Sequence, residues 1–279
     1  MNRFVLRTTA WLLLLMGLMG GGRPASAQLG ASSTVGLDST SVLPGTAEAS
    51  AGVWSGPLAG PSLFYVAEGT TTLYNLPNSS TPVTRLPMRT PVTRLGCTGP
   101  WCRIRTERGR TGYVEASALS NVWIRVSKAK RRVYLYRGPT LLYTFDADMA
   151  YNSFADKVRA GGKTNRDHWR TPEGTFYVVH KNPDSKFYKA LVLNYPKVED
   201  ARRGLKKGLI SRAQYRAIKE AQEEFRIPPM NTKLGGWIEI HGNGTGAATA
   251  WTQGCVAVQN RAMDVLWKQV RVGTPVLVE

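Results

Sequence analysis

The sequence contains few cysteines, few acidic residues and no long apolar run. Among its 279 residues are 3 cysteines, 3 histidines and 19 acidic residues, against 37 basic ones. Because the cysteines and histidines form no ligand cluster, we expect no metal site and no cofactor. The apolar run from Trp11 to Met19 is shorter than the roughly 20 residues that a membrane-spanning helix needs. We therefore expect no transmembrane segment in the mature chain.

The N-terminal residues have the composition of a secretory signal peptide. Arg3 and Arg7 precede the apolar run, and Ala25-Ser26-Ala27 has the small residues of a cleavage site. We expect a signal peptide over residues 1–27, cleavage after Ala27 and export, with an uncleaved anchor as the alternative. No cysteine follows the apolar run, which argues against a bacterial lipoprotein.

The excess of basic residues persists after the leader is removed. Without Arg3, Arg7 and Arg23, 34 basic residues face 19 acidic ones, a net charge of about +15. Such a field favours polyanions, including nucleic acid, anionic lipid and carboxylate-bearing wall polymers. Export argues against nucleic acid as a partner, and the basic residues are scattered along the chain. A basic surface that only keeps the protein soluble is the alternative.

Three cysteines in an exported chain indicate one disulfide and one free thiol. Cys97 and Cys102 enclose Thr-Gly-Pro-Trp, a stretch typical of a hairpin tip, so we predict that they pair. Cys255, the one cysteine of the C-terminal half, remains. An odd cysteine in a secreted protein indicates a reactive thiol.

The composition divides the chain into segments. Residues 28–60 are rich in Ser, Thr, Ala and Gly and predict a flexible linker. Residues 61–120 contain short β-rich runs between turn residues, which is typical of a small barrel. Residues 121–279 form a second, mainly β domain with some α-helix. A helical segment between Glu199 and Phe225 interrupts it, either as a cover over a cleft or as a plain surface pair of helices.

The segment before the C-terminus carries the chemistry. His241 stands in Ile-His-Gly-Asn, 14 positions before Cys255 in Thr-Gln-Gly-Cys-Val-Ala-Val-Gln-Asn. We predict strands at 237–240 and 255–258, with Asn260 capping a helix that follows. A neutral imidazole can take a thiol proton, and the thiolate can then attack a carbonyl carbon. The two residues therefore predict thiol-based acyl transfer.

Two stretches resemble known families. The late motif of the first domain resembles a bacterial SH3 domain, in residues Trp101, Ile104, Gly109, Gly112, Tyr113 and Val114. That resemblance implies wall-peptide binding, and a spacer role stays equally open. The stretch from Trp123 to Glu279 resembles an L,D-transpeptidase catalytic domain of the YkuD type, nearest to the YafK-like branch. The residues that match this family lie at positions 124–126, 132–136, 171–174, 194–196, 240–242 and 252–260.

This second resemblance implies a β-sandwich domain with a helical insertion and a covered cleft. It implies a cysteine-dependent enzyme that acts on peptidoglycan stem peptides through a thioester at diaminopimelate. The general pattern has a second histidine where this chain has Gln253, and commonly an arginine where it has Ala257. Both departures resemble the YafK-like branch, and they leave His241 as the base.

The resemblance also implies roles for single residues. The carbonyl of Gly242 holds the imidazole, and the backbone N–H groups of Gly254 and Cys255 stabilise the oxyanion. Thr252 and Gln253 belong to the same oxyanion and substrate-binding stretch. Tyr195 lines the donor site or lies in the core. Trp251 covers the thioester or has a packing role.

The implied location is the periplasm or cell wall of a bacterium. The implied partners are stem peptides and a lysine-bearing, wall-anchored protein. Three outcomes stay open: crosslinking, protein attachment, and hydrolysis that releases attached protein, as in the YafK-like branch. A non-catalytic wall-binding protein is a competing hypothesis, although the intact pair of His241 and Cys255 argues against it. A general cysteine peptidase would need an Asn or Asp partner that these surroundings lack.

Overall fold

The structure is a computed structural model that describes residues 62–78 and 81–279. The signal peptide expected at 1–27 and the linker expected at 28–60 lie outside the described residues. Within the described part, no helix combines the length and apolar character needed to cross a membrane.

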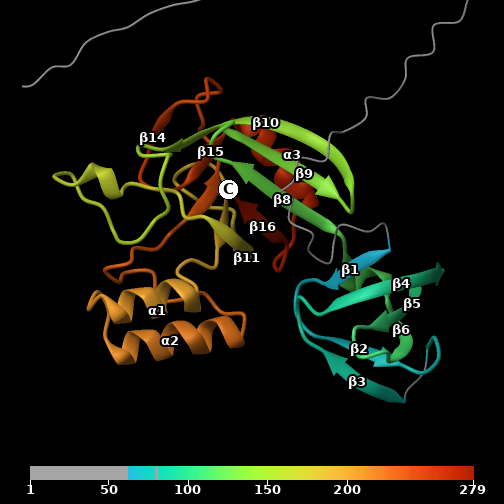
Figure 1. Cartoon of the computed structure of the whole chain (residues 1–279). Coiled ribbons are helices and arrows are strands. Elements are labelled where there is room, and N and C mark those ends of the chain that lie inside the picture. Colours follow the sequence, from blue (N-terminus) through green and yellow to red (C-terminus); the bar gives the residue numbers. More distant parts are fainter. Residues whose placement is uncertain (1–61, 79–80) are drawn as a thin grey trace, which may run out of the picture. The chain divides into compact units, whose positions relative to one another are not determined.

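The first domain is built from short antiparallel strands (Figure 1). They pair in the order β3-β2-β6-β5-β4-β1-β7. Alternation places one side chain in two on the inner face, and the buried side chains there are almost all aliphatic or aromatic. The elements are β1 (Leu63–Val66), β2 (Thr71–Tyr74), β3 (Pro82–Leu86), β4 (Pro91–Thr98), β5 (Trp101–Thr106), β6 (Thr111–Glu115), a 3₁₀ turn (Ala116–Ala118) and β7 (Leu119–Ser120).

A disulfide links the paired strands β4 and β5. Cys97 lies directly opposite Cys102 in their register, and the structure joins the two sulfurs. Gly99, two residues after Cys97, has a φ of 57°, a left-handed conformation that glycine adopts without strain. Glycine at the tip thus lets the chain reverse between the two cysteines. Cys255 is the free cysteine of the described chain.

The second domain is a mainly β fold whose nine-stranded sheet closes on itself. Its strand order is β14-β10-β15-β13-β12-β11-β16-β8-β9, and β9 pairs again with β10. The mainly β fold class with helical insertion is confirmed, and this closure gives the sheet a barrel-like form. The elements are β8 (Val122–Ser127), β9 (Arg132–Arg137), β10 (Thr140–Ala150), a 3₁₀ turn (Arg166–His168), β11 (Gly174–Asn182), β12 (Ala190–Leu193), α1 (Val198–Lys206), α2 (Arg212–Glu223), β13 (Glu239–His241), β14 (Ala250–Thr252), β15 (Val256–Val258), α3 (Asn260–Gln269) and β16 (Pro275–Val278).

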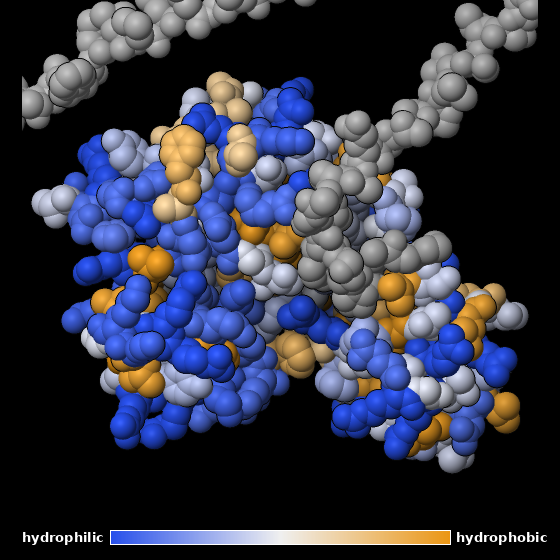
Figure 2. Space-filling model, in the orientation of Figure 1, coloured by the Kyte–Doolittle hydropathy of each residue, from blue (hydrophilic) through white to orange (hydrophobic). Residues whose placement is uncertain are grey.

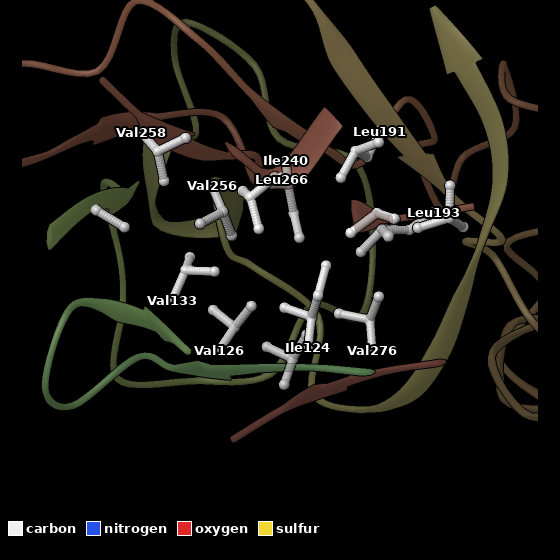
Figure 3. Close-up of a cluster of buried hydrophobic side chains, with 14 of the residues drawn as sticks. Ile124, Val126, Val133, Leu191, Leu193, Ile240, Val256, Val258, Leu266 and Val276 are labelled. Carbon is white, nitrogen blue, oxygen red and sulfur yellow. The ribbon is translucent and has the colours of Figure 1, made fainter. Parts of the chain in front are cut away.

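The core of this domain lies inside the closed sheet. Figure 3 shows aliphatic side chains from several strands and from α3 pointing toward one another, including Ile124, Ile240, Val256 and Leu266. All four have no exposed surface, and burying a side chain of this size stabilises a fold by about 2 kcal/mol. Because these residues are fixed inside, their neighbours on β13 and β15 face the other way.

The helical segment forms a pair of short helices, α1 and α2. Ser211 begins α2 with a reciprocal cap, since its Oγ accepts the Gln214 N–H while the Gln214 side chain accepts the Ser211 N–H. Ile218 and Ala201 pack between the helices. No residue of either helix lines the cavity of about 730 Å³ that contains Cys255. This favours the plain surface pair of helices over a cover.

The described surface is predominantly hydrophilic on the face drawn in Figure 2, and hydrophobic residues form separate patches there. The whole chain carries a formal net charge of +18. Charge at the surface costs little, because water solvates it. The fold thus places most of its basic excess outside the two cores.

Candidate active site

Two adjacent parallel strands place the histidine and the cysteine. In the register of β13 and β15, Ile240 lies opposite Val256 and His241 opposite Ala257. Ile240 and Val256 point into the core (Figure 3). Alternation therefore turns His241 and Cys255 toward the other face of the sheet. Both residues line one cavity of about 730 Å³.

This site cavity has a size typical of a small-molecule or peptide pocket. Four stretches of chain contribute its walls, within residues 157–169, 182–187, 235–241 and 251–255. The first two are loops that leave β10 and β11, and the last two surround the histidine and cysteine. The cavity therefore brings together segments that are far apart in the sequence.

The imidazole of His241 is held in one orientation. Its Nδ1 lies 2.7 Å from the carbonyl oxygen of Gly242, and a carbonyl only accepts, so Nδ1 carries the proton. Nε2 is then an acceptor in the neutral ring. Phe187 stacks on the ring with 4.4 Å between centroids, and Trp251 meets it edge-on at 6.4 Å. The geometry therefore leaves Nε2 as the nitrogen of His241 that can accept a proton.

The surroundings keep the imidazole neutral. His241 is 1% exposed, and this burial lowers its pKa below the ordinary histidine value. The hydrogen bond to Gly242 and the charge of Asp148 oppose that shift. A neutral imidazole can accept a proton, which a pre-formed imidazolium cannot do.

The thiol of Cys255 is also neutral at rest. Its Sγ donates a hydrogen bond to the carbonyl oxygen of Trp237, at 3.2 Å. Burial and then the nearby charge of Glu239 raise its pKa to about 12, while a backbone hydrogen bond from Glu239 and the charges of Lys157 and Lys186 oppose the shift. Little thiolate exists at neutral pH under these conditions, so a base must generate the nucleophile during the reaction.

Asp148, on β10, organises the loop between the histidine and the cysteine. Its carboxylate accepts hydrogen bonds from the backbone N–H and hydroxyl of both Thr245 and Thr249, and from the indole N–H of Trp251, at 2.7–3.0 Å. Burial raises the pKa of Asp148, but these hydrogen bonds outweigh it and the net pKa lies below the usual value. One buried carboxylate thus fixes the loop and the cavity wall at Trp251.

Asn260 does not act as the expected helix cap. Helix α3 has Gln259 at its N-cap position, without a side-chain cap, and Asn260 is its first residue. The Asn260 Oδ1 instead accepts the N–H of Asn243, at 2.7 Å. A Cβ added to Gly242 would lie 2.5 Å from the same oxygen. The amide therefore secures the turn after His241, which explains why a glycine stands there.

Tyr195 takes the second of the two places that the sequence left open, and the N–H of Gly254 has a partner within its own turn. Tyr195 is fully buried, its hydroxyl donates to the Leu234 carbonyl at 3.0 Å, and it does not line the site cavity. It is a core residue. The N–H of the buried Gly254 points to the Thr252 hydroxyl at 3.4 Å, while that hydroxyl donates to the Cys255 carbonyl at 2.6 Å. Thr252 therefore shapes the turn before the cysteine.

Three other predicted residues do line the cavity: Trp251, the buried Thr252 and the exposed Gln253. Gly242 holds the imidazole without lining the cavity itself. Ala257, at the position where related sequences commonly have arginine, is completely buried. The side chain at that position therefore carries no charge toward the cavity.

A family model of the L,D-transpeptidase catalytic domain (YkuD) matches residues 121–278, more than half of the chain. The chain belongs to the L,D-transpeptidase catalytic domain family. A model of the bacterial SH3 domain matches residues 77–120. Both families are those that the sequence motifs resembled, and neither match identifies the YafK-like branch.

Solved structures with related folds are similar to this L,D-transpeptidase family member at low sequence identity. An L,D-transpeptidase from Xylanimonas cellulosilytica is 16% identical over 57% of this chain and 61% of its own, with a TM-score of 0.34. A Bdellovibrio bacteriovorus protein is 20% identical over 59% and 49%, with a TM-score of 0.37. The E. faecium L,D-transpeptidase catalytic domain, solved acylated by ertapenem, is 17% identical over 57% and 96%, with a TM-score of 0.31.

This chain thus spans 61% and 49% of the first two of these proteins. No curated protein matches the sequence. The family assignment accordingly rests on the family model.

Sequence reasoning missed two charged residues of this L,D-transpeptidase domain. Asp148 lies between Ala147 and Met149, both buried. An aspartate between apolar residues at the end of a strand was the sequence signal that could have indicated a buried carboxylate. Lys157 is 3% exposed and lines the site cavity. It stands in a loop without periodicity, so only the folded chain reveals its position.

Proposed function

We propose that this protein is a cysteine-dependent L,D-transpeptidase that acts on peptidoglycan stem peptides. The observation that carries the proposal is the pairing, in one cavity, of a free thiol at Cys255 with a neutral, oriented imidazole at His241. Membership of the L,D-transpeptidase family supports the choice of substrate class. Export to the periplasm or cell wall belongs to the same proposal.

The first half-reaction forms a thioester. The thiol exchanges its hydrogen bond to the Trp237 carbonyl for one to Nε2 of His241, which takes the proton. Sγ then attacks the carbonyl carbon of the diaminopimelate residue in a stem tetrapeptide. Since Gly254 directs its N–H to Thr252, we assign the backbone N–H of Cys255 as an oxyanion donor. The bond to the terminal D-alanine breaks, and its nitrogen receives the proton from His241.

The second half-reaction transfers the acyl group. An acceptor amine or a water molecule gives a proton to Nε2 of His241 and attacks the thioester carbon. The carbon–sulfur bond breaks, and the thiolate regains its proton from the imidazole. A diaminopimelate amine yields a crosslink, a protein lysine yields an attached protein, and water yields hydrolysis.

Hydrolysis is the second candidate, as in the YafK-like branch. Two observations favour it: Gln253 stands exposed at the cavity in place of a second histidine, and Ala257 replaces the common arginine. In this variant the enzyme cleaves the same type of bond and releases wall-attached protein. The SH3-like domain would hold the enzyme on wall peptides, or serve as a spacer, in either case.

Purified protein incubated with tetrapeptide-bearing sacculi tests the proposal, with mass spectrometry of the products. We expect released D-alanine together with crosslinks, attached protein or trimmed tripeptides, and none of these with Cys255→Ala protein of equal thermal stability. Wild-type protein that binds sacculi but yields none of these products, and releases no protein from sacculi that carry attached protein, would instead be a non-catalytic wall-binding protein. Muropeptide analysis of a deletion strain then separates the acceptors, since it shows lost crosslinks, lost attachment or excess attachment.

A further inference from the structure

A buried lysine lies beside the cysteine, in the loop that follows β10. Lys157 is 3% exposed and lines the site cavity. Its ammonium Nζ lies 3.5 Å from the carbonyl oxygens of Gln253 and His168. These distances are at the long limit of hydrogen bonding, whose usual N···O separation is about 2.9 Å. The ammonium group is therefore close to Cys255 and poorly satisfied.

No carboxylate of the described chain forms an ion pair with this lysine. Among the ion pairs of residues 62–78 and 81–279, none includes Lys157, and the charged groups that act on it are Cys255 and Arg170. Lys128, which is equally buried, shows the alternative. Its Nζ lies 2.7 Å from Glu173 and 2.8 Å from the Ala155 carbonyl. The fold thus provides a partner for one buried lysine and leaves the other without one.

Two glycines leave room for the side chain of Lys157. Gly235 and Gly254 have φ values of 89° and 144°, which favour glycine. A Cβ at Gly235 would lie 3.1 Å from Cε of the lysine, and one at Gly254 would lie 3.5 Å from its Nζ. Trp169, another cavity residue, has an indole N–H without a hydrogen-bond partner in the described chain. The cavity wall thus combines a buried cation with a second polar group that lacks a partner.

Such a cation is costly without an anion. Burial lowers the pKa of Lys157 to about 8, and a buried charge without a partner destabilises a fold. A bound carboxylate would supply the missing counter-charge. The acidic residues nearby do not supply it in the described chain, because Asp156 bonds to Arg203 and Asp167 to Arg170, and no ion pair joins Lys157 to Glu239 across the cavity. A ligand is therefore the available source of the anion.

We propose that Lys157 binds the terminal α-carboxylate of the donor stem peptide and so selects donors that end one residue beyond the scissile bond. This rests on the proposed function. In a donor held for attack by Cys255, that carboxylate carbon is two bonds from the scissile nitrogen. It therefore lies within a few ångströms of the thiol, which is where Lys157 stands. A longer donor places a neutral amide there and leaves the lysine unpaired.

Kinetics with two donors test this assignment. The donors are a disaccharide-tetrapeptide with a free terminal carboxylate and its C-terminal amide. We expect wild-type kcat/KM to be about 30–100-fold higher for the free acid, since a charged partner is lost in the amide. In Lys157→Met protein, kcat/KM falls by this factor for the free acid and changes little for the amide. The ratio of kcat/KM between acid and amide therefore falls to about one. Lys207→Met removes an exposed lysine after α1 and keeps the wild-type ratio.

If Lys157→Met lowered kcat/KM equally on the free acid and the amide, the lysine would act on the thiol or on folding, and the proposal would be overturned. Unchanged kcat/KM on both donors would overturn it as well. Thermal melts confirm that the variants are folded, and Lys157→Gln repeats the test if Met disturbs packing.

Binding separates this proposal from the proposed function. If wild-type protein turns over neither donor, the proposed function fails, and calorimetry on Cys255→Ala protein still decides the role of Lys157. Binding of the free acid at least tenfold tighter than the amide, abolished by Lys157→Met, supports the assignment. Equal binding of acid and amide contradicts it.

Discussion

The SH3-like domain and the L,D-transpeptidase domain bury different kinds of side chains. Among the described residues up to 120, Ser120 is the one buried polar residue, and the rest of the interior is apolar. The L,D-transpeptidase domain buries six acidic or basic ones: Lys128, Asp148, Lys157, Asp200, Glu239 and His241. Burying such groups costs free energy unless they are paired or hydrogen-bonded. The difference shows that the second domain accepts a lower free energy of unfolding in exchange for acidic and basic groups beside its cavity.

The ionisable groups of the second domain are not spread evenly. Lys157, Glu239 and His241 line the site cavity, and Asp148 fixes the loop beside it. The first domain keeps its charges outside and adds a disulfide. A substitution in the site should therefore change activity and stability in ways that a substitution in the first domain does not.

The largest expected effect is on catalysis, from His241→Gln. Glutamine has a similar size but cannot take a proton, so we expect kcat/KM on tetrapeptide donor to fall by about 10³–10⁴-fold. His180→Gln, on the exposed side of β11, provides the control and should leave the rate within twofold. Steady-state kinetics measure both. Equal rates for wild type and His241→Gln would exclude His241 as the base.

The next effect compares two aspartates on β10. Asp148→Ala leaves the donors of Thr245, Thr249 and Trp251 without their acceptor, and we expect a loss of about 4 kcal/mol in the free energy of unfolding. Asp146→Ala breaks an exposed ion pair with Arg132 at 3.2 Å and should cost under about 1 kcal/mol. Urea denaturation gives both values. Similar losses would show that the loop is held by other contacts.

The two buried lysines should respond with opposite signs. At pH 7, Lys157→Met removes an unpaired cation, and the shift of its pKa from 10.5 to about 8 corresponds to a gain of roughly 3 kcal/mol. Lys128→Met leaves Glu173 and the Ala155 carbonyl without their donor and should lose about 2 kcal/mol.

The pH dependence of the free energy of unfolding tests whether Lys157→Met stabilises the protein. Because its pKa is lower in the folded state, the unfolded chain binds more protons between about pH 8 and 10.5, and wild-type stability rises with pH there. The advantage of Lys157→Met is therefore complete below pH 8 and vanishes above 10.5. Denaturation at pH 7 and pH 10 measures it. A variant less stable than wild type at pH 7 would assign Lys157 a structural role.

The smallest effect concerns the first domain. Replacing Cys97 and Cys102 by serine opens a short loop, and chain entropy predicts a loss of about 2 kcal/mol in that domain. Calorimetry records the loss, and kcat/KM on soluble donor should stay within twofold. A parallel fall in activity would mean that the two domains are not independent in function.

The sequence alone predicts much of this comparison, because local patterns determine it. Alternation around Ile240 and Val256 predicts short strands beside His241 and Cys255, and the Cys97–Cys102 spacing predicts a hairpin. Those features depend on near neighbours in the chain. The strands of the structure begin or end within a few residues of the expected ones.

Other features depend on contacts between distant segments. Tyr195 is buried because Leu234, 39 positions away, accepts its hydroxyl. Asn260 turns from the helix end to Asn243 because the loop passes within reach. Lys157 is 96 positions from Gln253. No local pattern encodes these separations, so only the folded chain decides between core and donor site for Tyr195 and reveals the missing cap and the buried lysine.

Intact-mass spectrometry after incubation with ertapenem tests the central claim most directly, since it asks whether the thiol that shares a cavity with His241 is an acylating nucleophile. The account predicts one adduct per chain, mapped to the peptide that contains Cys255 and absent from Cys255→Ala protein. A folded wild-type protein that remains unmodified, or an adduct that persists in Cys255→Ala, would contradict it.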